Sequence, residues 1–205
     1  MTPPDPETMP SSMQAPRFTE TYIAEALSIL RDIDHDDVEE LVGHLALAST
    51  IYVCGLGGSA AHASHMANDL TKLCGKTAIC PTDNVALMTA LANDEDFETW
   101  LTCWFGLQNW PDERNEAMLF LSVGGGNGRT SKCLVDAALF AKQSHIPVLA
   151  IVGRDGGELA KRADCAIVIP NLYPDRVTPH VEGITSVLLH LLVTHPALAR
   201  NKPKW

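Results

Sequence analysis

The fold is decided by the stretch Ile51-Tyr-Val-Cys-Gly-Leu-Gly-Gly-Ser-Ala-Ala-His-Ala-Ser-His-Met-Ala-Asn-Asp69. Residues 51–54 form a short apolar run, which predicts a buried strand. The glycines that follow allow the backbone to turn sharply and to approach a ligand closely. A helix is expected next, and its first amide groups could hold an anion such as phosphate. His65 and Asp69 are four residues apart, so they would lie on one face of that helix as a metal-binding or proton-transfer pair.

Length and composition favour one globular domain. The chain has 205 residues, of which 46% are hydrophobic, and this is enough to bury a full core. Its net charge of −10 argues against nonspecific binding to nucleic acid or to an anionic membrane. We expect no transmembrane helix, because no segment approaches the required length. The six cysteines are scattered without a C-x-x-C motif, which predicts reduced core residues of a cytoplasmic protein.

Apolar strands alternate with helix-like segments along the chain. This alternation predicts an α/β fold, with a parallel sheet covered by helices on both faces. We expect a single domain over residues 18–195, between a disordered N-terminal tail at 1–17 and a C-terminal tail at 196–205. Strands are expected at 51–54, 77–80, 117–122, 147–152 and 165–169, and the main helices at 18–30, 36–47, 84–92, 97–107, 131–144, 158–163 and 181–194.

A second glycine-rich loop, Ser122-Val-Gly-Gly-Gly-Asn127, follows the third expected strand. Ligands of parallel α/β folds bind at the carboxyl ends of strands, and both glycine loops lie at such ends. Three consecutive glycines cost backbone entropy, so we expect the backbone of this loop to lie close to a bound group. Two such loops suggest a phosphorylated small molecule that is held from two sides. The first loop alone could also be an ordinary tight turn.

In their order along the chain, these motifs resemble those of sugar isomerase (SIS) domain proteins, and most closely the phosphoheptose isomerase group. The resemblance implies a three-layer sandwich with a five-stranded parallel sheet between helices. It also implies a homotetramer with active sites between subunits. The implied activity converts sedoheptulose 7-phosphate to D-glycero-D-manno-heptose 7-phosphate, commonly with zinc bound. The resemblance covers residues 20–195 and is carried by 55–59, His65-x-x-x-Asp69, Asn93-Asp94, 122–127, 153–157, 178–182 and His190.

The resemblance implies a metal site made of His65, Asp69, Glu182 and His190. The two histidines match the family, whereas Asp69 stands for a glutamate and Glu182 for a glutamine. All four residue types can bind metal, and together they form a plausible zinc set. The family's glutamine touches the sugar, so Glu182 could alter the choice of substrate.

The phosphate-binding segment departs further from the family pattern. Val123 and Gly124 replace two of the hydroxyl residues usual there, the segment is two residues longer, and Leu56 stands where asparagine is usual. We therefore expect phosphate binding to rely more on backbone amides. The residues implied in substrate or phosphate binding are Gly57, Gly58, Ser59, Asn93, Asp94, Ser122, Gly124, Asn127 and Glu182, with Thr130 and Ser131 as further polar candidates.

An aldose–ketose isomerase moves a proton between C1 and C2 through an enediol. It needs a base, an acid and a group that stabilises the developing oxyanion, for which a metal can serve as a Lewis acid. Asp69 is the candidate base and His190 the candidate acid, although both could instead be metal ligands. Two other functions stay open. The first is an isomerase for another ketose phosphate, such as an octulose 8-phosphate in secondary metabolism. The second is a non-catalytic SIS protein that binds sugar phosphates or has a regulatory role.

Plain structural roles also stay open. His65 and Asp69 could form a surface pair on a helix, and Glu182 and His190 could be exposed polar residues of the last helix. His180 stands where the family often has arginine, and it could contact the substrate or lie in a loop.

Overall fold

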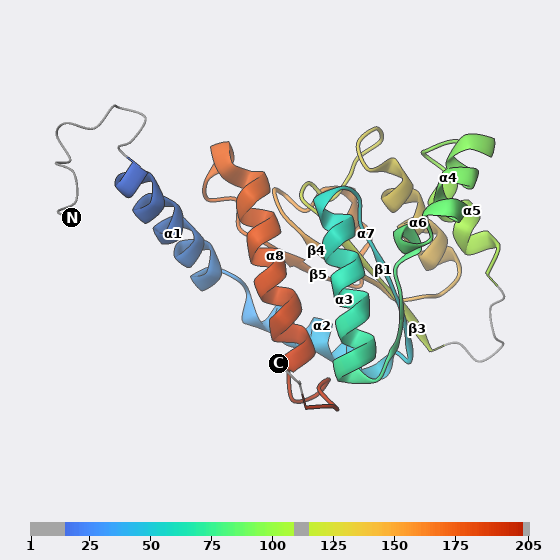
Figure 1. Ribbon diagram of the computed structural model, residues 1–205, viewed down its shortest axis with the longest axis horizontal. Helices are drawn as coiled ribbons and strands as arrows, with labels where there is room; N and C mark the ends of the chain where they lie inside the picture. The colour runs from blue at the N-terminus through green and yellow to red at the C-terminus, as the bar shows by residue number, and fades with distance from the viewer. Residues whose placement is uncertain (1–14, 109–114, 203–205) are drawn as a thin grey trace, which may run out of the picture.

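The computed structural model describes residues 15–108 and 115–202, and Figure 1 draws the remaining segments in grey. Most of the N-terminal tail expected at 1–17 lies outside the described residues. Helix α1 (Ala15–Arg31) begins inside that range, so residues 15–17 belong to a helix rather than to a tail.

The segment expected as a C-terminal tail packs back against the body over its described part. Leu198 is buried in the core. The amides of Arg200 and Asn201 both donate to the carbonyl of Leu73 at 2.9 Å. The packed structure therefore continues beyond residue 195.

Five strands form one parallel sheet in the order β2-β1-β3-β4-β5, which confirms the expected sheet. Within it Cys54 lies opposite Phe120, and Ser122 lies opposite Val152. The two central strands β3 and β4 are buried along their whole length, as in parallel sheets covered on both faces. The strands are β1 (Thr50–Cys54), β2 (Thr77–Ile79), β3 (Glu116–Ser122), β4 (Val148–Val152) and β5 (Cys165–Val168).

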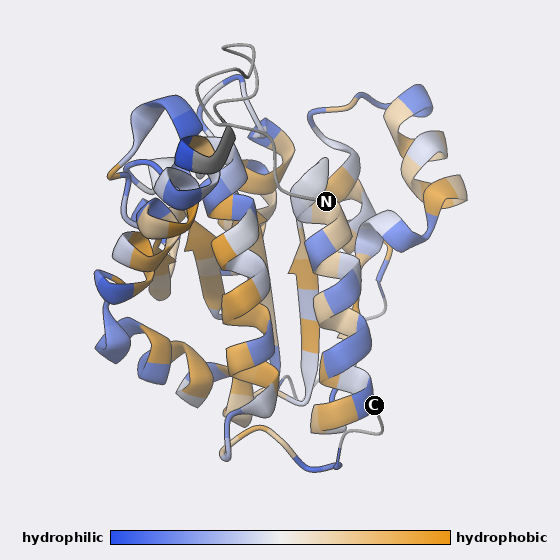
Figure 2. Cartoon of the chain, turned by 60° about the vertical axis from the view of Figure 1, so that its left-hand side comes forward, coloured by the Kyte–Doolittle hydropathy of each residue, from blue (hydrophilic) through white to orange (hydrophobic). Residues whose placement is uncertain are grey.

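Helices cover both faces of this sheet, because successive strand residues point to opposite sides. Val53 and Leu119 pack on one face, and Tyr52 and Phe120 pack on the other. The strands are accordingly mostly hydrophobic, whereas the helices show mixed surfaces (Figure 2). The first face carries α2 (His35–Leu47), α3 (Gly58–Cys74) and α8 (Val177–Thr194); the second carries α4 (Val85–Asp94), α5 (Trp100–Gly106), α6 (Lys132–Gln143) and α7 (Gly157–Arg162), and short 3₁₀ turns lie at Pro81–Asp83 and Pro174–Arg176.

Helices α3 and α8 lie side by side and run in the same direction (Figure 1). At their beginnings the Glu182 side chain lies against Gly58. Near their ends the thiol of Cys74 lies 3.6 Å from the carbonyl oxygen of Val193, to which it donates. The pair therefore forms a continuous strip that carries half of the predicted site residues, namely Gly58, Ser59, His65, Asp69, Glu182 and His190.

Helix α8 begins at Val177, four residues before the expected start at 181. Pro179 lies in its first turn, where a missing amide hydrogen costs little, so the proline does not break the helix. This earlier start places Thr178 on the helix rather than in a loop, while Glu182 lies on the helix as expected.

Among the residues that the structure describes, one helical segment is long and apolar enough to cross a membrane by length and composition. It covers Pro174–Thr194 and has a mean hydropathy of 1.2 over its best window. The expectation that no segment approaches this length is therefore wrong. Half of that window is buried inside the protein, where α8 packs as a core helix against α3.

A buried ionic cluster, the Glu25 cluster, joins α1 to the start of α8. Arg176 Nε and His180 Nε2 each lie 2.8 Å from Glu25 Oε2, and Arg176 also bonds the second carboxylate oxygen. The Tyr22 ring stacks on His180 with their centroids 4.5 Å apart. The hydrogen bond from Arg176 lowers the pKa of Glu25 to about 2, against the opposing effect of burial. His180 is thus a buried helix residue, and neither a loop residue nor part of the cavity lining described below.

Candidate functional site

A cavity of about 410 Å³ opens where β1 and β3 end. The two strands are neighbours, but the chain continues from β1 to β2 on one side and from β3 to β4 on the other. Parallel sheets bind ligands at such a switch point. Five predicted residues line the cavity, namely Ser59, Ser122, Gly124, Asn127 and Glu182, together with the further candidates Thr130 and Ser131.

The first glycine loop forms the start of α3. Gly57 has a φ of 58°, a backbone conformation that suits glycine. A Cβ atom at Gly55 would overlap the carbonyl of Ser59, so this position also needs glycine. The tight turn is therefore required by the chain itself, and it leaves Ser59 as a buried hydroxyl in the cavity wall.

Glu182 lies at this helix start. A Cβ atom at Gly58 would overlap the Glu182 carboxylate, which shows how closely the acid lies on the backbone. The amino end of a helix carries a partial positive charge that favours a negative group. Glu182 therefore belongs to the cavity wall in this structure.

The second glycine loop packs against the loop that follows β4. Gly125 and Gly126 have φ values of 65° and 71°, and a Cβ atom at Gly125 would overlap the carbonyl of Gly156. The amides of Glu158 and Leu159 donate to Gly126 and Gly125 at 3.0 and 2.8 Å. At Gly125 the close neighbour is thus another loop of the protein, which differs from the expected bound group. These bonds also occupy amides at the start of α7.

The Asn127 side chain was expected to contact a ligand, but in the structure it stabilises its own loop. Its side-chain oxygen accepts from the amides of Arg129 and Thr130, both at 2.8 Å. Its own amide donates to the Thr130 carbonyl at 2.9 Å. Within the Asn127 side chain, only the nitrogen is left to donate a hydrogen bond to a ligand.

His65, Asp69 and His190 come together on the outer side of the α3–α8 strip. One potential ligand atom from each lies within 4.8 Å of the others. His65 Nε2 is 3.1 Å from Asp69 Oδ2, and the two imidazole rings have centroids 5.0 Å apart. Asp69 is buried, while both histidines are exposed. We call these three residues the metal-competent trio.

The hydrogen bonds around the trio fit a metal site. His190 Nδ1 lies 2.9 Å from the Ser186 carbonyl oxygen, so this nitrogen donates and Nε2 keeps its lone pair. Asn68 donates to Asp69 Oδ1 at 2.8 Å and holds the carboxylate in place. Two imidazoles and one carboxylate are a donor set that suits zinc with a position left open.

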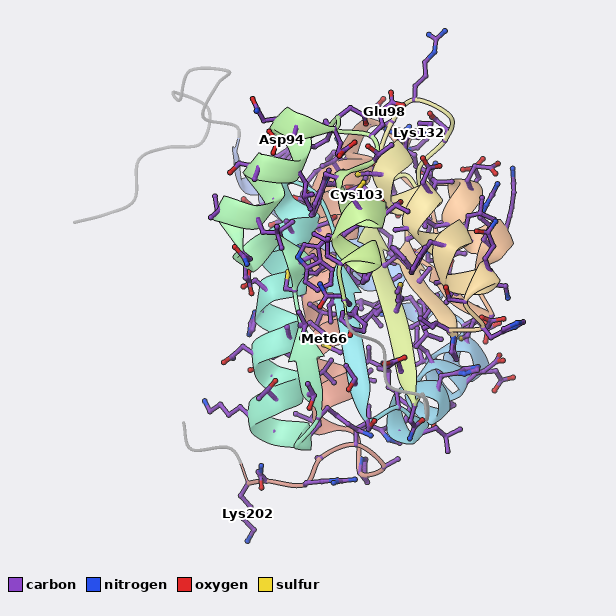
Figure 3. The ribbon with its side chains drawn as sticks, turned by 90° about the vertical axis from the view of Figure 1, so that its right-hand side faces the viewer. Met66, Asp94, Glu98, Cys103, Lys132 and Lys202 are labelled. Carbon is purple, nitrogen blue, oxygen red and sulfur yellow. The ribbon has the colours of Figure 1, made fainter. Side chains whose placement is uncertain are left out.

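Three other predicted residues lie away from the trio. Glu182 is eight residues before His190, which corresponds to about 12 Å along a helix, and it is not a member of the trio. Asn93 and Asp94 lie at the end of α4, as Figure 3 shows for Asp94. Both are exposed, Asn93 donates to Asp94 Oδ1 at 2.9 Å, and neither lines the cavity.

Arg154 and Thr178 line the cavity but were not singled out from the sequence. Arg154 lies in the loop 153–157, whose glycines drew attention while the arginine between them did not. An arginine next to the end of a strand, in a loop beside two glycine-rich turns, is a signal that could have found it. Thr178 was not expected on a helix beside the cavity, because the sequence predicted that α8 would begin only at residue 181.

No model of a known protein family matches the chain. The lincomycin biosynthesis protein LmbN from Streptomyces lincolnensis is 34% identical over 170 residues, which cover 75% of this chain but only 56% of LmbN. A phosphoheptose isomerase from Sulfurimonas denitrificans is 32% identical over 154 residues, 70% of this chain and 68% of that protein. The structure of a phosphoheptose isomerase from Neisseria gonorrhoeae shares the fold, with a TM-score of 0.72 at 22% identity over 86% of this chain and 96% of that one.

Proposed function

Since the chain belongs to the phosphoheptose isomerase family of SIS-domain proteins, we propose that it is an aldose–ketose isomerase for sedoheptulose 7-phosphate. The product would be D-glycero-D-manno-heptose 7-phosphate, formed through an enediol.

The observation that carries this proposal is the position of two features on the same pair of helices. The cavity lies at the starts of α3 and α8, and the metal-competent trio lies further along both helices. Ser59 and His65 are six residues apart, which corresponds to about 9 Å along a helix. An extended sugar phosphate with its phosphate in the cavity would therefore reach the level of His65, and Asp69 lies one helical turn further along α3.

His65, Asp69 and His190 would hold a zinc ion, which when bound supplies Lewis-acid polarisation of a carbonyl oxygen. Asp69 is the proposed base, because it is a buried carboxylate held in place by Asn68. His190 is the proposed acid; because Nδ1 is engaged by Ser186, the proton that it donates would have to be carried on Nε2. Coordination and proton transfer would compete for these atoms, so each residue serves one role at a time.

The proposed assembly is a homotetramer with sites between subunits. It is supported by the exposed apolar side chains of α1, among which Phe18 is 59% and Ile23 55% exposed. It is also supported by the position of Asn93 and Asp94, which a partner subunit would have to bring to a substrate. Light scattering coupled to gel filtration tests this: a monomer at working concentration would contradict it.

The test of the activity is incubation of the purified, zinc-loaded protein with sedoheptulose 7-phosphate in D₂O. Conversion to the aldose with deuterium at C2 is expected, read by NMR. The same assay with shorter and longer ketose phosphates shows which chain length is preferred.

A second candidate is an isomerase for an octulose 8-phosphate. The similarity to LmbN, whose name refers to lincomycin biosynthesis, favours it, as do Leu56, Val123 and Gly124 in the cavity wall. Faster turnover of the eight-carbon substrate would support it over the seven-carbon one. A protein with neither metal nor turnover would instead favour a non-catalytic sugar-phosphate binder.

A further inference from the structure

The described lining of the cavity includes two charged side chains. Among the described residues that line it, Arg154 has the one positively charged side chain and Glu182 the one negatively charged side chain. The other polar groups of the wall are hydroxyls and the Asn127 amide. Arg154 is exposed, and its guanidinium forms no ion pair or hydrogen bond with the described part of the chain. A cation without a partner is therefore available at the cavity.

The backbone holds Arg154 in an unfavourable conformation. Its φ is 56°, in the left-handed region that residues with a side chain rarely adopt. Such a conformation persists where neighbouring bonds impose it. Here the amide of Gly153 donates to Ser122 at 3.3 Å, and that of Gly156 donates back to Gly153 at 3.0 Å. The turn fixes the direction in which the arginine leaves the backbone.

That direction takes the side chain across Gly124. A Cβ atom at Gly124 would lie 3.4 Å from Arg154 Cδ and 3.5 Å from its Nε. A side chain at 124 would therefore begin in van der Waals contact with the arginine and share the space beside it. The loss of side chains in the glycine loop and the presence of the arginine are two parts of one arrangement.

We propose that Arg154 binds the phosphate group of the substrate and replaces the hydroxyl contacts that Val123 and Gly124 do not make. This rests on the proposed function, which supplies the phosphorylated substrate. Arginine suits the role, because its planar fork can bond two phosphate oxygens at once. The start of α6, at Ser131, lines the same cavity and favours an anion there, whereas the Glu182 carboxylate already lies at the start of α3.

The test compares Arg154→Gly with the wild-type protein and with Arg129→Ala. Glycine adopts a positive φ freely, so Arg154→Gly removes the guanidinium while relieving strain, and its Tm should be unchanged or higher. Arg129 is an exposed cation near the same cavity that does not line it, which makes it the matched control. Binding of inorganic phosphate is measured by calorimetry, and KM and kcat with sedoheptulose 7-phosphate.

Arg154→Gly should weaken phosphate binding and raise KM about tenfold to a hundredfold, the range for losing a charge-assisted hydrogen bond. Its kcat should stay within a small factor of wild type. The phosphate affinity and KM of Arg154→Lys should lie between those of Arg154→Gly and wild type, because lysine keeps the charge without the planar fork of arginine. Arg129→Ala should bind phosphate as the wild type does.

Equal phosphate affinity of Arg154→Gly and wild type would overturn the proposal, as would a lower kcat at constant KM. Absence of phosphate binding by the wild type would overturn it together with the proposed function. Phosphate binding that depends on Arg154, without turnover of any ketose phosphate, would support Arg154 and reject only the isomerase.

Discussion

Helix α8 carries two histidines ten residues apart, and each lies beside a carboxylate from another helix. His180 is 3% exposed, pairs with Glu25 and stacks under Tyr22. His190 is exposed, lies against His65 and shares the neighbourhood of Asp69. The Glu25 cluster and the metal-competent trio each pair a histidine of α8 with a carboxylate, yet their other members and their surroundings differ.

The difference lies in which lone pairs and protons are already used. In the Glu25 cluster both oxygens of the buried carboxylate accept from Arg176 or His180, so its charge is balanced. In the trio Asp69 accepts from Asn68 and lies beside His65, whereas His190 Nε2 has no hydrogen-bond partner among the residues that the structure describes. Balanced and buried groups stabilise the fold, whereas unsaturated and accessible ones are able to bind and react.

The largest expected effect comes from the trio. Asp69→Asn should lower the isomerisation rate by about a hundredfold to ten-thousandfold, the usual contribution of a general base, with little change in Tm. Initial rates and deuterium exchange at the substrate carbon measure it. Glu25→Gln is the matched control from the Glu25 cluster and should keep the exchange. Undiminished exchange in Asp69→Asn would remove Asp69 as the base.

Zinc affinity should respond differently to the loss of two histidines, His190 in the trio and His195 outside it. His190→Ala should weaken zinc binding by at least about tenfold to a hundredfold, since loss of even a supporting partner of a ligand has that effect. Competition with a coloured chelator measures the affinity. His195→Ala, at the end of the same helix, should leave it unchanged. Equal zinc affinities of the two variants would contradict a site at the trio.

A smaller effect, on stability, is expected in the Glu25 cluster. The folded pKa of Glu25, about 2, lies below its ordinary value of 4.5, so the ionised acid stabilises the fold. That stabilisation is present above pH 4.5 and is lost as the pH falls toward 2.

Glu25→Gln should therefore lower Tm by several degrees at neutral pH, and the difference from wild type should shrink across that acidic window. Thermal melts at a series of pH values measure it. Glu20→Gln, an exposed acid on the same helix, should show no such difference. A Tm gap that is independent of pH would mean that Glu25 contributes through packing alone.

The smallest expected effect is on zinc affinity, and it tests whether Glu182 belongs to the cavity wall alone or also to the metal site. Glu182→Gln should leave zinc affinity within about twofold, because helix rise puts position 182 about 12 Å from His190. A loss as large as that of His190→Ala would instead make Glu182 a fourth ligand, as the family resemblance implied. The same chelator competition decides between the two outcomes.

The parts of this molecule that could be predicted from sequence are those with a local signal. Strand β4 was expected at 147–152 and is found at Val148–Val152, since a buried strand is a continuous apolar run. The facing of His65 and Asp69 follows from a spacing of four on a helix.

The parts that could not be predicted depend on distant partners. Glu25 and His180 are 155 residues apart, and nothing near either residue indicates the other. Arg154 reaches the cavity through a positive φ that no neighbouring residue type requires. The backbone around Gly125 was expected to lie close to a bound ligand, because the sequence does not show that the loop after β4 lies against it.

The sheet order has a further consequence for how this protein can change. The last ladder pair of β3 and β4 is Ser122 with Val152, and the cavity wall begins where that ladder stops. Residues 127–131 can therefore be lengthened, shortened or exchanged without breaking a hydrogen bond of the strands, whereas Gly125 and Gly126 stay tied to α7. Diversification by evolution, or by a designed library, can act on the wall alone while one unchanged scaffold supports many different specificities.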